Sequence, residues 1–218
     1  MDPNLLIDGL ISYLGFIILC TFHEFGHAWM AWKCGDDTAY LQGRVSLNPA
    51  VHIDLMGTVV LPLLGLFLSL NGSNAAQFII GWAKPVPVNP YNLRNRRGDD
   101  ILVTLAGPWM NLLIAVILMG LCKLGVMAHI EGVVRLCFNM AALSLFLCFF
   151  NLLPVPPLDG SRVVRVLTGM TYEAYHQIAR YGFIMVILIW QIRPVQNLII
   201  GLTRGTLSQL GLWFGVTG

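Results

Sequence analysis

The sequence predicts an all-α polytopic membrane protein, with about five to six transmembrane or re-entrant segments. Short β-like edges are expected between spans one and two and before span three. Of the 218 residues, 56% are hydrophobic and 11% are charged, against roughly 25% charged residues in a typical soluble domain. A soluble domain of this size could not bury so much apolar surface. The composition excludes a disordered chain, and a net charge of +2 argues against a nucleic-acid partner.

Long runs that are almost free of charge locate the spans, because about 20 apolar residues cross a bilayer. The first run lies between Asp8 and Lys33 and contains one charged residue, Glu24. Since acidic residues precede it, we expect a membrane span there and not a cleaved signal peptide. Three further runs lie between Asp54 and Lys84, between Asp100 and Lys123, and between Arg135 and Asp159.

Two regions are less regular. Lys and Arg gather in cytoplasmic loops, and their distribution places both ends of residues 52–83 inside. We therefore expect Leu55–Leu70 to cross and Ala75–Ala83 to return. A weaker apolar run covers Tyr181–Ile192, and the pattern beyond Pro194 predicts an amphipathic helix at the membrane interface. Residues 1–218 are expected to form a single domain, with a catalytic core at about 10–165 and a C-terminal span and interfacial helix at about 176–215.

The first span contains the motif His23-Glu24-Phe25-Gly26-His27. On a helix the two histidines lie about 40° apart on one face, where their imidazoles can bind one zinc ion. Glu24 lies beside them and is suited to act as a general base. The alternative is that the histidines are core residues with satisfied hydrogen bonds. An ionisable side chain inside a span costs about 2.5–3.5 kcal/mol, which favours a functional role.

A second motif follows the fourth run, in the segment 151–160 with the sequence NLLPVPPLDG. Proline cannot continue a regular helix, so this span should break near Pro154. Such a break inside a membrane is tolerated where it lines a cavity or is buried in protein. Asp159 is then the natural third zinc ligand, because two histidines and one carboxylate leave a fourth position open. The alternative is that Asp159 caps a helix beginning at Ser161.

A third motif, AGPWMN at residues 106–111, lies in the third span. Gly107 allows another helix to approach closely. Asn111 places an amide in an otherwise apolar run, where it can donate to a substrate carbonyl or to the oxyanion formed from it. The alternative is a hydrogen bond between two helices, which asparagine often makes in membranes.

In this order and in successive apolar spans, HEFGH, AGPWMN and NLLPVPPLDG resemble the site-2 protease family of intramembrane zinc metalloproteases. The resemblance covers residues from about Leu10 to Arg165, and it includes the segments GRVSLNPAVHIDLMGTVVLP and GWAKPVPVNP. The chain is similar to the short bacterial type, which has no PDZ or CBS domain. The resemblance implies a multi-pass protein of the bacterial cell membrane.

The resemblance further implies one Zn²⁺ ion per chain, with His23, His27 and Asp159 as ligands and Glu24 as the general base. Asn111 would position the substrate or stabilise the oxyanion. The implied reaction is hydrolysis within the transmembrane segment of a membrane-protein substrate, in the lipid bilayer and near the cytosolic side. An extended substrate could add as a strand to the segments near 41–48 and 84–90.

Two other functions stay open: a catalytically inactive relative that binds membrane helices, and a metal transporter. A transporter usually spreads its polar ligands along a path through several spans, whereas the distribution of basic residues predicts that the three motifs lie at one depth. An inactive relative would have no need of the base, Glu24. His52 is expected at the membrane interface and not among the metal ligands.

Overall fold

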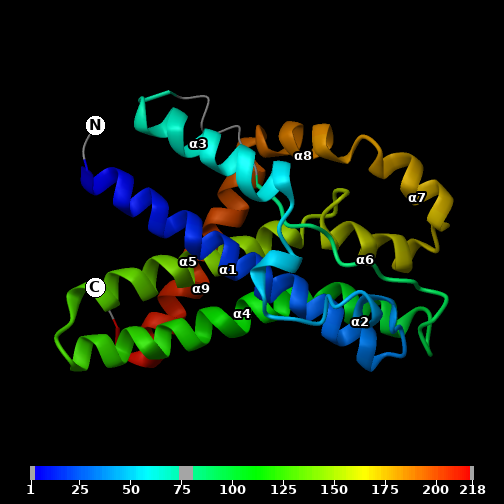
Figure 1. Ribbon diagram of the computed structural model, residues 1–218, viewed down its shortest axis with the longest axis horizontal. Coiled ribbons are helices and arrows are strands. Elements are labelled where there is room, and N and C mark those ends of the chain that lie inside the picture. The colour runs from blue at the N-terminus through cyan, green and yellow to red at the C-terminus, as the bar shows by residue number, and fades with distance from the viewer. Residues whose placement is uncertain (1–2, 74–80, 217–218) are drawn as a thin grey trace. The chain divides into compact units, whose positions relative to one another are not determined.

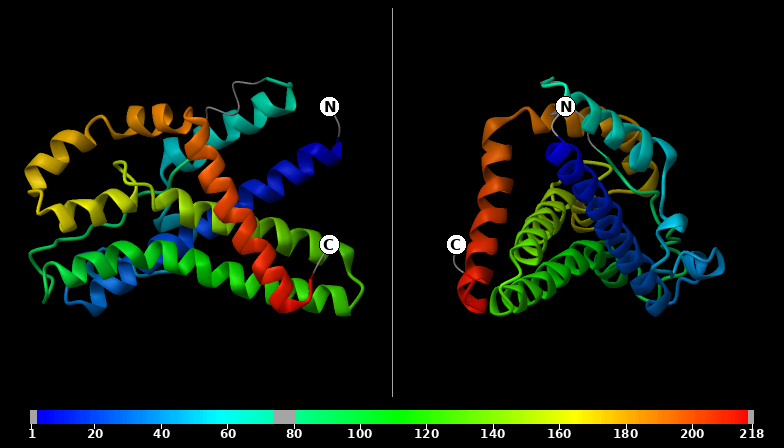
Figure 2. Two further views of the ribbon diagram at one scale, coloured as in Figure 1. Left: turned by 180° about the vertical axis from the view of Figure 1, so that it is seen from behind. Right: turned by 60° about the vertical axis from the view of Figure 1, so that its left-hand side comes forward.

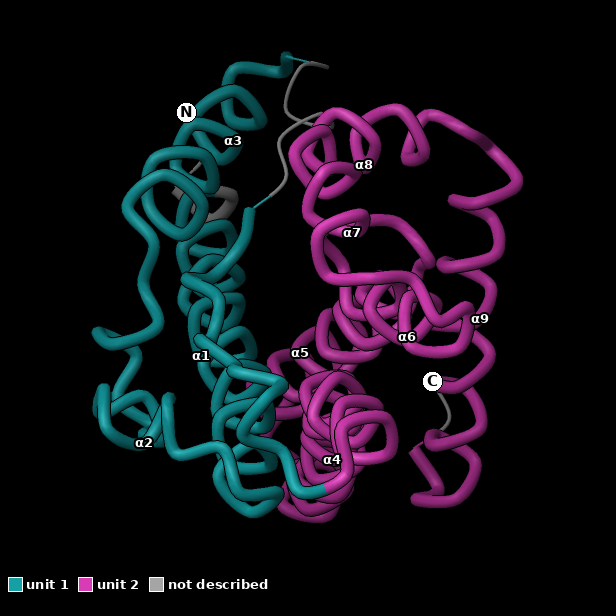
Figure 3. The backbone as a smooth tube through the Cα atoms, turned by 90° about the vertical axis from the view of Figure 1, so that its right-hand side faces the viewer, with its two compact units in different colours: residues 1–94 teal, residues 95–218 magenta. Residues whose placement is uncertain are grey.

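The computed structural model describes residues 3–73 and 81–216. The chain folds into two compact units, residues 1–94 and residues 95–218 (Figure 3). In the described ranges the regular structure is helical and no β-strand forms. The prediction of an all-α protein is therefore confirmed, and the predicted β-like edges are not. The expectation of a single domain stays a prediction.

The first unit is built around one long helix, α1, drawn in blue in Figure 1. Its regular elements are α1 (Pro3–Lys33), α2 (Thr38–Leu41), the 3₁₀ turn η1 (Pro49–Val51), the π-helical turn η2 (Leu55–Val60) and α3 (Leu61–Leu70). The apolar run that predicted the first span accounts for α1, and Glu24 lies in its C-terminal half.

Gly35 ends α1 by adopting a left-handed backbone conformation, with φ of +103°, which glycine tolerates without a steric penalty. The amide of Asp36 then donates to the carbonyl of Ala31 at 2.9 Å, and the amide of Gly35 donates to Trp32 at 3.2 Å. This pair of bonds is the Schellman arrangement, which satisfies carbonyl groups at the end of a helix. The chain consequently turns sharply away just after the last turn of α1.

Residues 81–89 have no regular secondary structure but are firmly held inside the first unit. Ala83 and Val86 are buried, and Val86 packs with Ala28 of α1 and Ala39 of α2. Hydrogen bonds hold the segment near both ends and in between: Thr58 Oγ1 to Trp82 O at 2.8 Å, Lys84 N to His52 O at 2.9 Å, and Asn89 N to Asp36 Oδ2 at 2.7 Å. The segment is thus fixed next to α1.

Prolines explain why residues 84–90 form no strand. Pro85, Pro87 and Pro90 have no backbone N–H, so they cannot donate to a ladder between strands. The region 41–48 consists of the end of α2 and turns. A substrate strand could therefore pair beside 84–87 only by donating its own N–H groups.

The second unit is a helical assembly around α4 and α5. Its elements are α4 (Gly98–Met127), α5 (Glu131–Asn151), α6 (Asp159–Thr168), α7 (Tyr172–Ala179), α8 (Gly182–Trp190) and α9 (Arg193–Phe214). Figure 2 shows α9, in orange to red, alongside α4 and α5. A buried apolar core joins these three helices, made of Ala115, Met119, Ala141, Leu145, Leu207 and Leu210.

The predicted break near Pro154 is confirmed, because α5 ends at Asn151 and α6 begins at Asp159. Gly160 lies against the backbone carbonyls of Leu152 and Leu153, and a Cβ atom at this position would collide with both. Only glycine fits such a close approach of two backbones. The first turn of α6 is thereby fixed against the end of α5.

Three described helices are long and apolar enough to cross a membrane: Leu6–Lys33, Gly98–Met127 and Glu131–Asn151. The pair α8 and α9 meets at 82° and would count as a fourth span if it formed one broken segment. The predicted number of five to six is therefore not confirmed. Leu55–Leu70 is a shorter apolar helix, and most of its expected returning partner, 75–83, lies outside the described residues.

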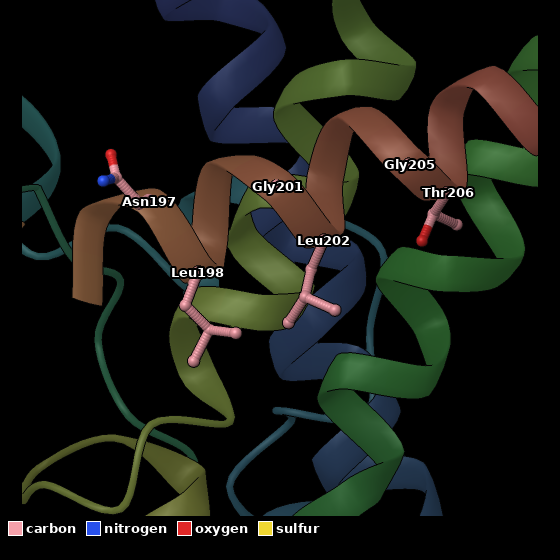
Figure 4. Close-up of a pocket in the computed structure, with 6 residues that line it drawn as sticks. All are labelled: Asn197, Leu198, Gly201, Leu202, Gly205 and Thr206. Atoms are coloured by element: carbon pink, nitrogen blue, oxygen red, sulfur yellow. The ribbon is translucent and has the colours of Figure 1, made fainter. Parts of the chain in front are cut away.

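The segment after Pro194 does form a helix, α9, and its Leu207 and Leu210 pack in the core of the second unit. Its expected position at the membrane interface stays a prediction. On α9 a shallow groove of about 420 Å³ is also present. Figure 4 shows Leu198 and Leu202 pointing to the same side of the helix, while Gly201 and Gly205 leave open space.

A buried ion pair connects three helices of the second unit. Arg165 of α6 donates to the carboxylate of Asp100 in α4, and both side chains are almost wholly buried. The hydroxyl of Tyr172, at the start of α7, donates to the same carboxylate at 2.8 Å, and the Arg165 guanidinium lies 3.8 Å from the centre of its ring. Burial and the neighbouring Asp100 carboxylate raise the pKa of Tyr172 to about 12.

We expect Asp100→Ala to lower the free energy of unfolding by about 3–5 kcal/mol, since it leaves a buried guanidinium without its counter-charge. Glu131→Ala, at an exposed position in the first turn of α5, is the matched control and should change stability little. The measurement is reversible unfolding of the purified protein in detergent micelles. Replacing both partners, with Asp100→Leu and Arg165→Met, should recover most of the loss; a double variant as unstable as Asp100→Ala would contradict this account.

Candidate active site

The histidines of the HEFGH motif face one another on α1. His23 Nε2 and His27 Nε2 are 3.1 Å apart, and both side chains are buried, with 7% and 4% of their surface exposed. Two nitrogen ligands at 2.0–2.1 Å from a tetrahedral zinc ion are separated by about 3.3 Å. The two imidazoles therefore have the spacing that a shared metal ion requires. The two histidines lie on one face of α1, as the helical periodicity predicted, and their role as metal ligands stays a prediction.

Glu24 is held by a backbone amide of the 81–89 segment. Its Oε2 accepts a hydrogen bond from the N–H of Val86 at 2.9 Å, and the side chain is only partly buried. A carboxylate that accepts such a bond keeps a fixed direction while its second oxygen can still act on another group. The sequence did not predict this contact. The one signal in the sequence was the pair of prolines on either side of Val86, which have no N–H of their own.

His52 lies in the interior, with 2% of its surface exposed, although the sequence suggested a position at the membrane interface. Its Nε2 donates to the carbonyl of Ser46 at 2.8 Å, and its own carbonyl accepts from Lys84 N. Burial lowers the pKa of His52, and the nearby positive charge of Arg44 lowers it further, while the Ser46 bond and Glu24 oppose the shift. His52 therefore supports the backbone next to Glu24 as a neutral imidazole.

The remaining predicted site residues belong to the second unit. Asn111 lies in α4 and is fully buried; its backbone carbonyl accepts a hydrogen bond from Ser144 Oγ of α5 at 2.7 Å. Asp159 is the first residue of α6 and is also buried, with 7% exposure. It therefore lies inside the first turn of α6 and does not precede a helix that starts at Ser161.

Comparison with known proteins identifies the family. Residues 11–129 and 122–190 match the model of Peptidase family M50. The chain belongs to peptidase family M50. The resemblance to site-2 proteases and the prediction of a metalloprotease, a hydrolase, are thereby confirmed. With its long apolar helices, this family M50 member is a membrane protein.

The curated relatives that match this family M50 chain carry the name "Putative zinc metalloprotease". It is 36% identical over 199 residues to "Putative zinc metalloprotease YwhC" of Bacillus subtilis, covering 86% of this chain and 80% of that protein. It is 33% identical over 201 residues to "Putative zinc metalloprotease Rip2" of Mycolicibacterium smegmatis, covering 86% and 71%. The expected zinc cofactor agrees with these names. No solved structure matches the chain.

A neutral, buried His52 makes stability depend on pH. Because its pKa is lower in the folded protein than in the unfolded chain, the stability it contributes is complete above about pH 6.5 and is lost as the pH falls through the folded pKa. We expect the melting temperature of the wild type to fall from pH 7.5 to pH 5 more steeply than that of His52→Gln. His176→Gln, at an exposed position, should follow the wild-type curve. Parallel curves for wild type and His52→Gln would contradict the prediction.

Proposed function

We propose that this chain is a zinc-dependent intramembrane endopeptidase that cleaves transmembrane helices of other membrane proteins near the cytosolic side. The observation that carries the proposal is the pair of facing Nε2 atoms of His23 and His27, 3.1 Å apart on an apolar helix, with Glu24 between them in the sequence. A metal transporter has no use for a base next to its ligands, and family M50 membership favours a peptidase.

His23 and His27 would hold the zinc ion through Nε2, and Asp159 would supply the third ligand. The donor set supports this, since two imidazoles and one carboxylate are typical of catalytic zinc sites that keep a position open. Gly160 supports it further, because the tight packing beside Asp159 gives the carboxylate a defined origin on α6. A bound zinc ion supplies a Lewis acid that polarises a carbonyl and makes water acidic.

Glu24 would move the protons of the reaction. Its carboxylate accepts one proton from the attacking water as the new C–O bond forms on the scissile carbonyl carbon. It then returns that proton to the leaving amide nitrogen as the C–N bond breaks, so that the carboxylate is regenerated. The hydrogen bond from Val86 N–H would keep the Glu24 carboxylate directed while its other oxygen exchanges the proton.

Asn111 would donate its side-chain amide to the substrate carbonyl oxygen. Such a donor stabilises the negative charge that develops on this oxygen during attack. The hydrogen bond from Ser144 to the Asn111 carbonyl supports the assignment, since it fixes the backbone from which the amide projects.

The substrate helix must unwind locally before its peptide bond can react, because helical hydrogen bonds shield the carbonyl. The basic residues near the ends of the apolar runs support an orientation with the three motifs toward the cytosol; they are Lys33, Arg44, Arg94, Arg96, Arg97, Arg162 and Arg165. The protein would then be a multi-pass protein of the bacterial cell membrane that takes part in regulated intramembrane proteolysis.

We expect Glu24→Gln to reduce cleavage about 10²–10⁴-fold, which is the usual contribution of a general base, while zinc stays bound. Cleavage is followed with purified enzyme and a set of single-span bacterial membrane segments carrying a tag at each end. Glu131→Gln is the matched control, because it removes the same charge at an exposed position. An unchanged rate for Glu24→Gln would refute the assignment, and binding of the segments without any cleavage by wild type would indicate an inactive relative.

We expect His23→Ala and Asp159→Ala to lose zinc as well as activity, because each removes one of three ligands. Metal content of the purified proteins by mass spectrometry is the measurement, and wild type should contain one zinc ion per chain. His129→Ala, outside both motifs, is the control and should keep its zinc. Full zinc occupancy in Asp159→Ala would require another third ligand.

Asn111→Ala should slow turnover about 10²–10³-fold, the usual effect of losing an oxyanion donor, and leave zinc content near the wild-type level. Ser144→Ala is a useful comparison, since it removes only the bond to the Asn111 backbone. If activity in Asn111→Ala falls only in proportion to the loss of folded protein, the residue serves helix packing.

A further inference from the structure

Arg44 is a buried cation of the first unit, and the mechanism proposed above gives it no role. Its side chain is 5% exposed, and burying a guanidinium is costly unless hydrogen-bond acceptors compensate for the lost water. The acceptors are backbone carbonyls: Arg44 Nη2 donates to Lys84 O at 2.6 Å and to Pro85 O at 3.3 Å. Arg44 therefore fixes two consecutive peptide units that lie 40 and 41 residues further along the chain.

The next residue after these carbonyls is Val86, whose N–H donates to Glu24. Pro85 and Pro87 have no N–H, so the Val86 amide is the single backbone donor in 85–87. Its direction depends on the peptide plane between Pro85 and Val86, which is the plane that contains the Pro85 carbonyl. Rotation of this plane would turn the N–H away from the carboxylate, and the hydrogen bond from Arg44 to that carbonyl opposes the rotation.

Electrostatic coupling supports this connection. Burial lowers the pKa of Arg44, and the negative charge of Glu24 opposes the lowering. The Arg44 guanidinium therefore lies near enough to the Glu24 carboxylate for the two charges to interact. The hydrogen bonds of Arg44 go to the backbone of Lys84 and Pro85.

We propose that Arg44 is a positioning residue for the general base: it fixes the Lys84 and Pro85 carbonyls so that the Val86 amide holds Glu24 in its working direction. The inference rests on the proposed function, in which Glu24 is the base. Arg44 acts through the backbone, because its hydrogen bonds go to the Lys84 and Pro85 carbonyls. Its loss should therefore reduce kcat and leave zinc content and KM close to wild type.

The kinetic test compares Arg44→Gln and Arg44→Lys with wild type, using the tagged single-span segments. A displaced catalytic group costs about 10²-fold in rate, so Arg44→Gln should lose about that factor in kcat. Arg44→Lys keeps a cation that can donate to one carbonyl and should recover part of the loss. Arg97→Gln, at an exposed position, is the matched control and should behave as wild type.

Hydrogen exchange at the Val86 amide is the second readout and needs neither zinc nor cleavage. The amide should exchange slowly in wild type and in Arg97→Gln, and faster in Arg44→Gln, with Arg44→Lys in between. Unchanged exchange at Val86 in Arg44→Gln would overturn the inference, as would equal kcat in wild type and Arg44→Gln. If Arg44→Gln fails to fold, Arg44→Lys decides in the same way. Normal cleavage by Glu24→Gln would instead overturn the proposed function, and the exchange rates would still decide whether Arg44 fixes Val86.

Discussion

A carboxylate inside an apolar helix needs a hydrogen-bond donor, and many contacts of the first unit serve to supply one to Glu24. Glu24 lies in α1, where lipid offers no donor and an unpaired charged group is costly. The N–H of Val86 supplies the donor from a segment 62 residues away. Everything that fixes residues 81–89 therefore also serves Glu24, including the Asp36 contact at one end and the Thr58 contact at the other.

Much of the fold follows from the sequence because its causes are local. Charge-free runs predicted α1, α4 and α5, since apolar length decides which helices can cross a bilayer. Proline chemistry predicted the end of α5. The spacing of His23 and His27 predicted their facing rings, because helical geometry alone brings residues i and i+4 together.

Other features depend on contacts between residues that lie far apart in the sequence, and such contacts produce no periodic pattern in it. The bond between Glu24 and Val86 and the contact of Arg44 with Lys84 join positions that no local pattern relates. The β-like edges were expected near 41–48 and 84–90, but the prolines of 84–90 have no N–H to donate to a ladder between strands. The helix α9 meets α8 at 82° and shares a buried core with α4 and α5, and composition does not reveal that packing.

The hydrogen bonds of the backbone amides in residues 84–87 also affect whether this protein can associate with other chains in a crowded membrane. Lys84 and Val86 have already given their amides to His52 and Glu24, and Pro85 and Pro87 have none. These four consecutive residues therefore present no spare backbone N–H donor to another chain. An unpaired backbone edge is a template for aggregation when both donors and acceptors are free. This segment has no free N–H, and its Lys84 and Pro85 carbonyls already accept from Arg44, so two copies cannot pair through it as strands of a sheet.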